Sequence, residues 1–163
     1  MARVYRLLPP RKELREVFRY NEKTGKLYWR VSPSRNVQAG TECGCICSST
    51  GYRILNYNGR KYGAHRIIWM LVTGEDPESL FIDHINRDKT DNRIENLRLS
   101  TNAENLCNKP TKGAYLFRNK WRAQIHLKGK TKYLGSYATE AEAVEAYQKA
   151  AKELKGDFYF PYA

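Results

Sequence analysis

The sequence predicts an α+β protein built from two parts that differ in pattern. In the first part, Asn58-Gly59 between two strand-like segments is a strong signal for a β-hairpin. In the second, residues 121–127 alternate apolar and polar side chains with the period of two that a half-buried strand requires. Thr139 and Glu142 then form a capping box that begins an alanine-rich helix. We therefore expect a mixed first part, followed by a three-stranded antiparallel sheet packed on one helix.

The 163-residue chain is strongly basic, with a net charge of +12 and a pI near 9.6. Such a surplus indicates a polyanionic partner, nucleic acid before an acidic membrane. A hydrophobic content of 41% excludes a wholly disordered chain. Residues 1–15 lack the apolar core of a signal peptide, and the apolar run 67–72 is far below the roughly 18 residues that span a bilayer. The expected protein is soluble and intracellular, without a membrane partner.

Local patterns define the first elements. Leu14, Val17 and Phe18 stand at helical spacing, which predicts a short helix over residues 10–20. A strand at residues 26–31 follows a turn. We expect residues 1–36 to support the rest of the chain without carrying chemistry themselves.

A β-meander is predicted over residues 41–66. The apolar run 67–72, with Gly74 shortly behind it, predicts a buried helix that ends at the glycine. His65 precedes this run with no acidic residue or second histidine near it in the sequence. We expect this histidine to be packed or hydrogen-bonded rather than catalytic.

The chain contains four cysteines, and their spacing leaves two interpretations open. Cys43, Cys45 and Cys47 alternate and would share one face of a strand, whereas Cys107 lies far along the chain. This is neither a C-x-x-C pair nor a disulfide framework. Small buried thiols are the default interpretation, and a structural zinc site that includes Cys107 is the alternative.

The most informative stretch begins at a short predicted strand, residues 80–82. Asp83 and His84 stand at its end, and neighbouring strand residues point to opposite sides, so the strand should end or bend there. A second strand at residues 97–99 follows a polar loop. After it, Thr101 and Glu104 form a capping box for a short helix that carries Asn105.

Three interpretations of this stretch compete. An EF-hand calcium loop that starts at Asn86 is excluded, because Asp91 and Leu97 stand where Gly and Glu are required. A plain turn rich in Asn and Asp leaves the Asp83-His84 pair unexplained. The third interpretation is a single-metal phosphodiesterase, in which side-chain oxygens of Asp83 and Asn105 bind Mg²⁺ or Mn²⁺. His84, neutral near pH 7, would take the proton of the attacking water.

The motifs Asp83-His84, Asn96-Leu97-Arg98 and Asn105 resemble the HNH nucleases of the ββα-metal class, most of all the phage-encoded homing endonucleases. Upstream segments, Gly51-Tyr52-Arg53 and Ala64-His65-Arg66, extend the resemblance over about residues 37–108. It implies that Asp83 binds the metal, that His84 is the general base and that Asn96 holds the loop carrying the histidine. It also implies that Asn105 completes the metal site, in place of the usual second histidine. Oxygen ligands favour Mg²⁺ or Mn²⁺ over zinc.

The last part of the chain combines basic and apolar alternation. Residues 113–133 contain six basic side chains and no acidic one. Trp121, Ala123 and Ile125 should face the helix, whose predicted apolar stripe consists of Ala141, Val144, Tyr147, Ala151 and Leu154. The opposite, basic face of the sheet is then left for a DNA groove.

The segments 121–125, 133–137 and 143–151 resemble the AP2 DNA-binding domain, and the similarity covers about residues 113–160. In that family a three-stranded sheet reads the major groove. The resemblance, with the basic charge, implies these DNA-binding residues: Arg118, Lys120, Arg122, Gln124, His126, Lys130 and Tyr133. Gln124 and His126 replace a charged pair of that family, so the recognised DNA sequence does not carry over.

Together these observations predict three segments: a supporting segment 1–36, an HNH catalytic domain 37–108 and an AP2-like domain 109–163. The expected function is a site-preferring, nicking homing endonuclease in the cytoplasm of a phage-infected bacterium. It would act on double-stranded DNA with Mg²⁺ or Mn²⁺ and no small-molecule cofactor, as a monomer or a dimer. The alternative is a non-catalytic DNA-binding regulator with a vestigial HNH fold. An RNA-directed nuclease is less favoured, because Tyr133 alone is expected to be an aromatic on the basic face.

Overall fold

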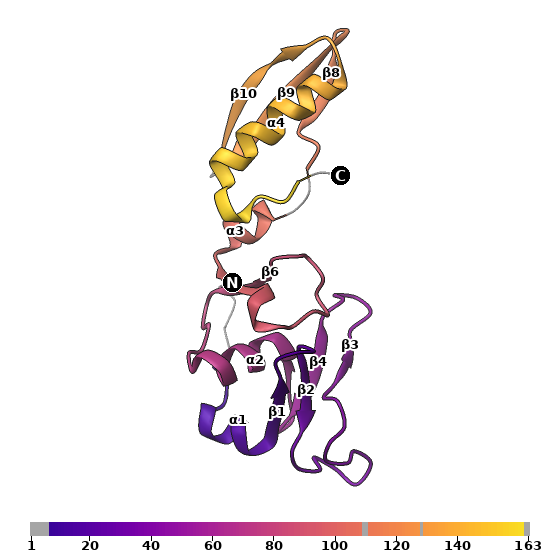
Figure 1. The fold of residues 1–163 in the computed structure, drawn as a ribbon, viewed down its shortest axis with the longest axis vertical. Helices are drawn as coiled ribbons and strands as arrows, with labels where there is room; N and C mark the ends of the chain where they lie inside the picture. The colour runs from indigo at the N-terminus through magenta and orange to yellow at the C-terminus, as the bar shows by residue number, and fades with distance from the viewer. Residues whose placement is uncertain (1–6, 109–110, 128, 162–163) are drawn as a thin grey trace. The chain divides into compact units, whose positions relative to one another are not determined.

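The computed structural model describes residues 7–108, 111–127 and 129–161. The chain divides into two compact units, Met1–Ser100 and Thr101–Ala163, and Figure 1 labels most of their helices and strands. Helices and short antiparallel sheets occur in both units, as expected for an α+β protein. The domain boundaries predicted after residues 36 and 108 stay predictions. Pro110, expected to end a helix, and Lys128, expected in a turn, lie outside the described residues.

The N-terminal segment contains α1 (Arg11–Val17), β1 (Phe18–Asn21) and β2 (Lys26–Trp29). The helix predicted over residues 10–20 is therefore too long, because the chain becomes extended at Phe18 and pairs with β2. Phe18 is buried, and its ring lies 4.9 Å from that of Trp29 across the strand pair. Its apolar side chain fitted both patterns, so periodicity could not distinguish them.

A three-stranded sheet follows, with the order β3-β4-β5. Its strands are β3 (Cys45–Ile46), β4 (Arg53–Tyr57) and β5 (Arg60–Gly63). The predicted hairpin between β4 and β5 is confirmed, because Asn58 and Gly59 both have positive φ angles, 49° and 71°. This is the backbone that a two-residue turn of type I′ requires.

The cysteines do not share one strand face, contrary to expectation. Cys43 is buried and Cys45 is exposed, because Gly44 between them adopts φ 72° and breaks the alternation before β3 begins. Both carry free thiols, as does Cys47. Burial raises the pKa of Cys43 to about 12, which suits an inert core thiol. The side chain of Cys107 lies outside the described residues.

Helix α2 (Ala64–Thr73) forms the centre of the first core through Ile67, Ile68 and Leu71. It ends where predicted, at Gly74 with φ 84°. Arg11 donates hydrogen bonds from Nε to the Leu71 carbonyl at 3.0 Å and from its terminal nitrogen to that of Val72 at 2.8 Å. These bonds satisfy carbonyls in the last turn of α2 that have no partner within the helix.

The first unit closes with β6 (Phe81–His84), η1 (Ile94–Asn96) and β7 (Leu97–Ser100). Strands β6 and β7 are antiparallel and form a sheet of their own. They confirm the two strands predicted around residues 80–82 and 97–99. The long loop between them is the polar stretch with the abundant Asn and Asp side chains.

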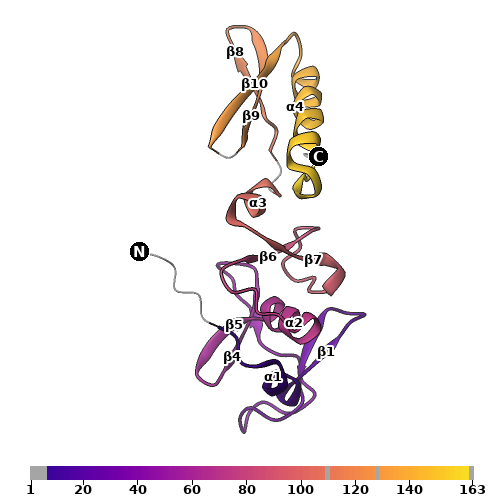
Figure 2. The ribbon, with the colours of Figure 1, turned by 90° about the vertical axis from the view of Figure 1, so that its left-hand side faces the viewer.

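The second unit contains α3 (Asn102–Cys107), β8 (Ala114–Phe117), β9 (Lys120–Leu127), β10 (Lys130–Tyr137), α4 (Glu140–Lys155) and η2 (Gly156–Phe158). Its sheet is an antiparallel meander with the order β10-β9-β8, and α4 lies along one face of it (Figure 2). The predicted architecture of three strands packed on one helix is confirmed. Both predicted capping boxes are also present.

The apolar stripe of α4 is rotated from the predicted one. Ala143, Tyr147 and Ala151 are buried, whereas Ala141 is exposed and Leu154 is 42% exposed. Tyr147 and Ala151 belong to the predicted and to the observed stripe, and the Tyr147 ring packs so tightly on Gly113 that a Cβ there would overlap it. The small side chains at 143 and 151 let the helix approach Ala123 and Ile125 of the sheet. No helix among residues 7–108, 111–127 and 129–161 is both long and apolar enough to cross a membrane.

Candidate active site and nucleic-acid surface

Asp83 and His84 lie at the end of β6, and both are buried, with exposed fractions of 5% and 3%. The strand ends at His84 and a turn follows, as the sequence predicted. In the β6–β7 ladder Asp83 faces Arg98 and His84 faces Leu97. Buried charged and polar side chains need specific partners, and these partners define the site.

Arg98 is the partner of Asp83. Its Nε and one terminal nitrogen donate to Asp83 Oδ2 at 2.9 and 2.7 Å. This charge-assisted pair holds the carboxylate in place at the end of β6. The sequence motif contained Arg98, but its contact with Asp83 became clear only from the strand register.

Asn92 is the partner of His84. Asn92 Oδ1 lies 2.9 Å from His84 Nε2, and Asn92 is itself buried. Because an amide oxygen can only accept, Nε2 carries the ring proton and Nδ1 holds the lone pair. The loop thus selects the tautomer in which Nδ1 is the basic nitrogen. The only sequence signal for Asn92 was its position in the polar loop that is rich in Asn and Asp.

The surroundings of His84 keep its imidazole neutral. Burial lowers the pKa of His84 below its ordinary value of 6.5, and the hydrogen bond that His84 donates to Asn92 and the nearby Asp83 carboxylate oppose that change. A histidine with a lowered pKa is unprotonated near pH 7 and can accept a proton. The role of His84 as a general base stays a prediction.

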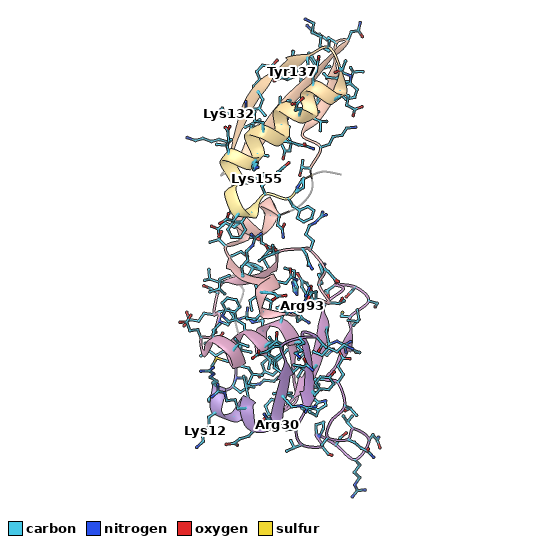
Figure 3. The ribbon with its side chains drawn as sticks, in the orientation of Figure 1. Lys12, Arg30, Arg93, Lys132, Tyr137 and Lys155 are labelled. Atoms are coloured by element: carbon cyan, nitrogen blue, oxygen red, sulfur yellow. The ribbon has the colours of Figure 1, made fainter. Side chains whose placement is uncertain are left out.

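Asn96 ties the ends of the loop together. Its Oδ1 accepts from the backbone N–H of Asn86 at 2.9 Å, and its Nδ2 donates to Asn86 Oδ1 at 2.9 Å and to the Asp91 carbonyl at 2.8 Å. Asp91 also accepts from Arg93 at 2.7 and 2.8 Å, and Figure 3 labels Arg93 in this loop. These contacts are those of a residue that holds the loop behind His84.

The N-terminal segment also contacts this loop. Tyr20 of β1 donates from its hydroxyl to the Asn92 carbonyl at 3.2 Å and accepts from the Ile94 N–H at 2.9 Å. Gly25 lies so close to the loop that a Cβ there would be 2.5 Å from the backbone nitrogen of Arg93. The supporting segment therefore braces the backbone of the residue that binds His84.

Two further rings surround His84. The Tyr52 and His65 ring centroids lie 5.8 and 5.5 Å from that of His84, and 5.0 Å from each other. His65 Nδ1 is buried without a hydrogen-bond partner among the described residues. Burial lowers the pKa of His65 to about 3, with His84 and Arg66 contributing in the same direction. His65 is thus a packed, neutral histidine.

The expected metal ligands belong to different compact units. Asp83 lies in the first unit, and Asn105 lies on α3 in the second. Carboxylate and carboxamide oxygens suit a hard divalent cation. Within the described part of the chain, no cluster of three or more His, Cys, Asp and Glu side chains could hold a metal. The metal site expected from the sequence stays a prediction.

The outer face of the second sheet carries Lys120, Arg122, Gln124 and His126 on β9, whereas Ala123 and Ile125 face α4. Tyr133 pairs with Gln124 and therefore shares this face. Lys130 pairs with Leu127 and belongs to the other face by register. Arg118 lies in the turn between β8 and β9, with φ 46°.

The outer face carries more aromatic side chains than the sequence suggested. Tyr115 and Phe117 pair with Arg122 and Lys120, so they share that face, and each is 38% exposed. The Arg122 guanidinium lies 3.8 Å from the centroid of the Phe117 ring. The expectation that Tyr133 would be the one aromatic residue on this face is wrong, because the sequence does not determine how β8 pairs with β9.

Parts of this chain are similar to a known protein family, to a viral relative and to a solved structure. Residues 62–107 match the HNH endonuclease family model. An uncharacterized HNH endonuclease of Acanthamoeba polyphaga mimivirus is 33% identical over 118 residues, which are 69% of this chain and 63% of the relative. A structure of DNA binding and cleavage by the HNH homing endonuclease I-HmuI is 23% identical with a TM-score of 0.40, covering 55% of this chain and 49% of that chain.

This chain therefore spans less than two thirds of each of these two proteins. The segment that matches the family model, residues 62–107, includes Asp83, His84, Asn96 and Asn105. The family match and the mimivirus relative together support an HNH endonuclease domain in this chain.

Proposed function

We propose that this protein is a site-preferring DNA endonuclease that nicks double-stranded DNA, of the homing type. The proposal rests above all on one observation: a buried neutral histidine, His84, whose Nε2 is fixed by Asn92 at 2.9 Å. A histidine arranged in this way, directly beside an aspartate in an HNH segment, is suited to activate water. The HNH match over residues 62–107 supports the same reaction class.

In the proposed reaction, His84 Nδ1 accepts a proton from a water molecule as the water oxygen attacks phosphorus. The P–O3′ bond breaks and the departing 3′-oxygen takes a proton from solvent water, which leaves a 5′-phosphate and a 3′-hydroxyl. Asn92 accepts the Nε2–H bond throughout and stabilises the imidazolium that forms. General base catalysis of this kind contributes roughly 10²–10⁴-fold in rate.

Asp83 and Asn105 are the proposed ligands of Mg²⁺ or Mn²⁺. The bound cation would supply positive charge to the phosphate oxygens. Arg98 orients the Asp83 carboxylate through its two hydrogen bonds. Asn96 keeps the loop closed behind His84, so that the base and the carboxylate stay at the end of β6.

The second unit is proposed to be an AP2-like domain that selects the site. Its proposed DNA-binding residues are Arg118, Lys120, Arg122, Gln124, His126, Lys130 and Tyr133. The charge of +12 on the whole chain favours a DNA partner. We propose residues 37–108 as the catalytic domain, residues 109–163 as the targeting domain and residues 1–36 as their support.

A supercoiled-plasmid assay tests the proposal. With Mg²⁺ present, the purified protein should convert supercoiled DNA into the open circular form, and a chelator should stop the reaction. With one site per chain, a monomer makes one nick, and a double-strand break requires a dimer or two successive events. Linear product formed in one concerted step by a monomer would contradict this proposal.

A further inference from the structure

Two rings from outside the polar loop enclose the imidazole of His84. Tyr52 stands just before β4, and His65 lies in the first turn of α2. The three ring centroids are 5.0, 5.5 and 5.8 Å apart. These separations lie within the range of packed aromatic pairs. Each ring of this cluster therefore contacts the other two.

Both outer rings are fixed from behind. At Gly63 a Cβ would lie 2.5 Å from Cε1 of His65, so the glycine backbone closes one side of that ring. Lys89 covers Tyr52, with its Nζ 4.8 Å from the ring centroid, and donates a hydrogen bond to the Thr50 carbonyl at 2.7 Å. Neither ring can move far without breaking a contact.

We propose that Tyr52 and His65 are positioning residues that hold the His84 imidazole at the angle at which Nδ1 meets the attacking water. This inference rests on the proposed function. The hydrogen bond to Asn92 holds the ring at one atom only, so it does not by itself stop the ring from rotating out of line with the amide oxygen. Two packed rings remove this rotation, and a misplacement of about 1 Å at a reacting group can lower a rate by about 10²-fold.

The contacts of His65 indicate that its ring shape is what matters. Its Nδ1 is buried and has no hydrogen-bond partner in the part of the chain that the structure describes. A side chain placed there to make hydrogen bonds would not leave that atom unsatisfied. Its faces and edges, in contrast, contact both Tyr52 and His84.

Paired variants test the proposal. Tyr52→Phe and His65→Phe keep a ring, whereas Tyr52→Ala and His65→Ala remove it. We expect the alanine variants to lower kcat for plasmid nicking by about 10–100-fold without weakening DNA binding. The phenylalanine variants should restore most of the activity. Thermal unfolding of each variant shows whether it is folded.

A second readout does not depend on activity. The chain has three histidines, so the ¹⁵N resonances of the His84 imidazole can be assigned in the protein without metal or DNA. The wild type and the phenylalanine variants should show one tautomer, protonated at Nε2. The alanine variants should show averaged tautomers. If the alanine variants fail to fold, Gly63→Ala takes their place. It displaces the His65 ring without removing it, and it should show averaged tautomers and a lower kcat.

The two readouts separate the possible failures. A wild type that does not nick DNA, together with alanine variants that lose the single tautomer, contradicts the proposed function and leaves the positioning role of the two rings established. Folded alanine or Gly63→Ala variants that keep both the single tautomer and the wild-type kcat overturn the positioning role. Phenylalanine variants as impaired as the alanine ones overturn it too, because ring shape would then not be the cause.

Discussion

Replacing Asn92 with alanine should slow the reaction by removing the acceptor of the His84 Nε2–H bond. That bond is 2.9 Å long and buried. A buried donor left without its acceptor costs about 1–3 kcal/mol. Because each 1.36 kcal/mol of barrier is a factor of ten, we expect kcat to fall by about 5–150-fold. The imidazole would also lose its preference for the tautomer in which Nε2 carries the proton and Nδ1 is unprotonated.

The same variant should change the pH profile in a defined direction. The bond to Asn92 raises the pKa of His84 against the larger effect of burial, which lowers it. Without Asn92 the pKa falls further, so the acidic limb of kcat/KM moves to lower pH while the plateau drops. The assay is single-turnover nicking of supercoiled plasmid at fixed Mg²⁺ across the pH range.

Asn36→Ala is the matched control, because Asn36 is an exposed asparagine in a loop of the same unit. It should nick at the wild-type rate. An Asn92→Ala protein that is folded and nicks at the wild-type rate would refute the assigned tautomer. An acidic limb that moved to higher pH would refute it equally.

Asn96→Ala should cost about 1–3 kcal/mol of stability, because it leaves buried loop groups without partners. In calorimetry the melting temperature should fall by roughly 4–8 °C per kcal/mol. An unchanged melting temperature would contradict the role of Asn96 in the loop. Burial lowers the folded-state pKa of His65 to about 3 and that of His84 below 6.5, so the unfolded chain binds more protons between these values. Stability should therefore fall as pH falls below 6.5, and His65→Phe should flatten that fall in thermal denaturation; a variant as sensitive to pH as the wild type would argue against a neutral buried His65. If about six phosphates are contacted, DNA binding should show a log–log salt slope near −5. Arg122→Ala should reduce this slope by about 1, whereas Lys149→Ala, at an exposed position on α4, should not; equal slopes for the two variants would place the DNA elsewhere.

Local chemistry accounts for what the sequence predicted well. The Asn58-Gly59 turn and the capping boxes at Thr101 and Thr139 depend on residues within a few positions of each other. Asp83 and His84 stood out because polar residues follow a short apolar strand at that point. The sequence predicts such features because the residues that determine them are neighbours in the chain.

Contacts between distant residues account for what the sequence did not predict. Tyr20 reaches the backbone of Asn92 from 72 positions away, and Tyr52 and His65 meet His84 only after β4 and α2 have packed. The hydrogen bond between Asn92 and His84 spans eight positions across a turn whose path no periodicity describes. These contacts therefore required the fold.

The wrong predictions of which residues share a face, on α4 and on the second sheet, have a similar cause. On α4, two overlapping stripes satisfied helical spacing, and the packing of Tyr147 on Gly113 decided between them. On the second sheet, the pairing of Tyr115 with Arg122 brought an aromatic side chain to the basic face. Partners supplied by other elements selected the outcome in each case.

The central claim is that His84 is the base of a DNA-cutting site, and the comparison of wild type with His84→Ala tests it most directly. Nicking of supercoiled plasmid with Mg²⁺ and binding to the same DNA would be measured side by side. The account predicts that the wild type nicks the plasmid, and that His84→Ala abolishes nicking while binding stays nearly unchanged. A folded His84→Ala protein that nicks at the wild-type rate, or a wild type that binds DNA and never nicks it, would contradict the account.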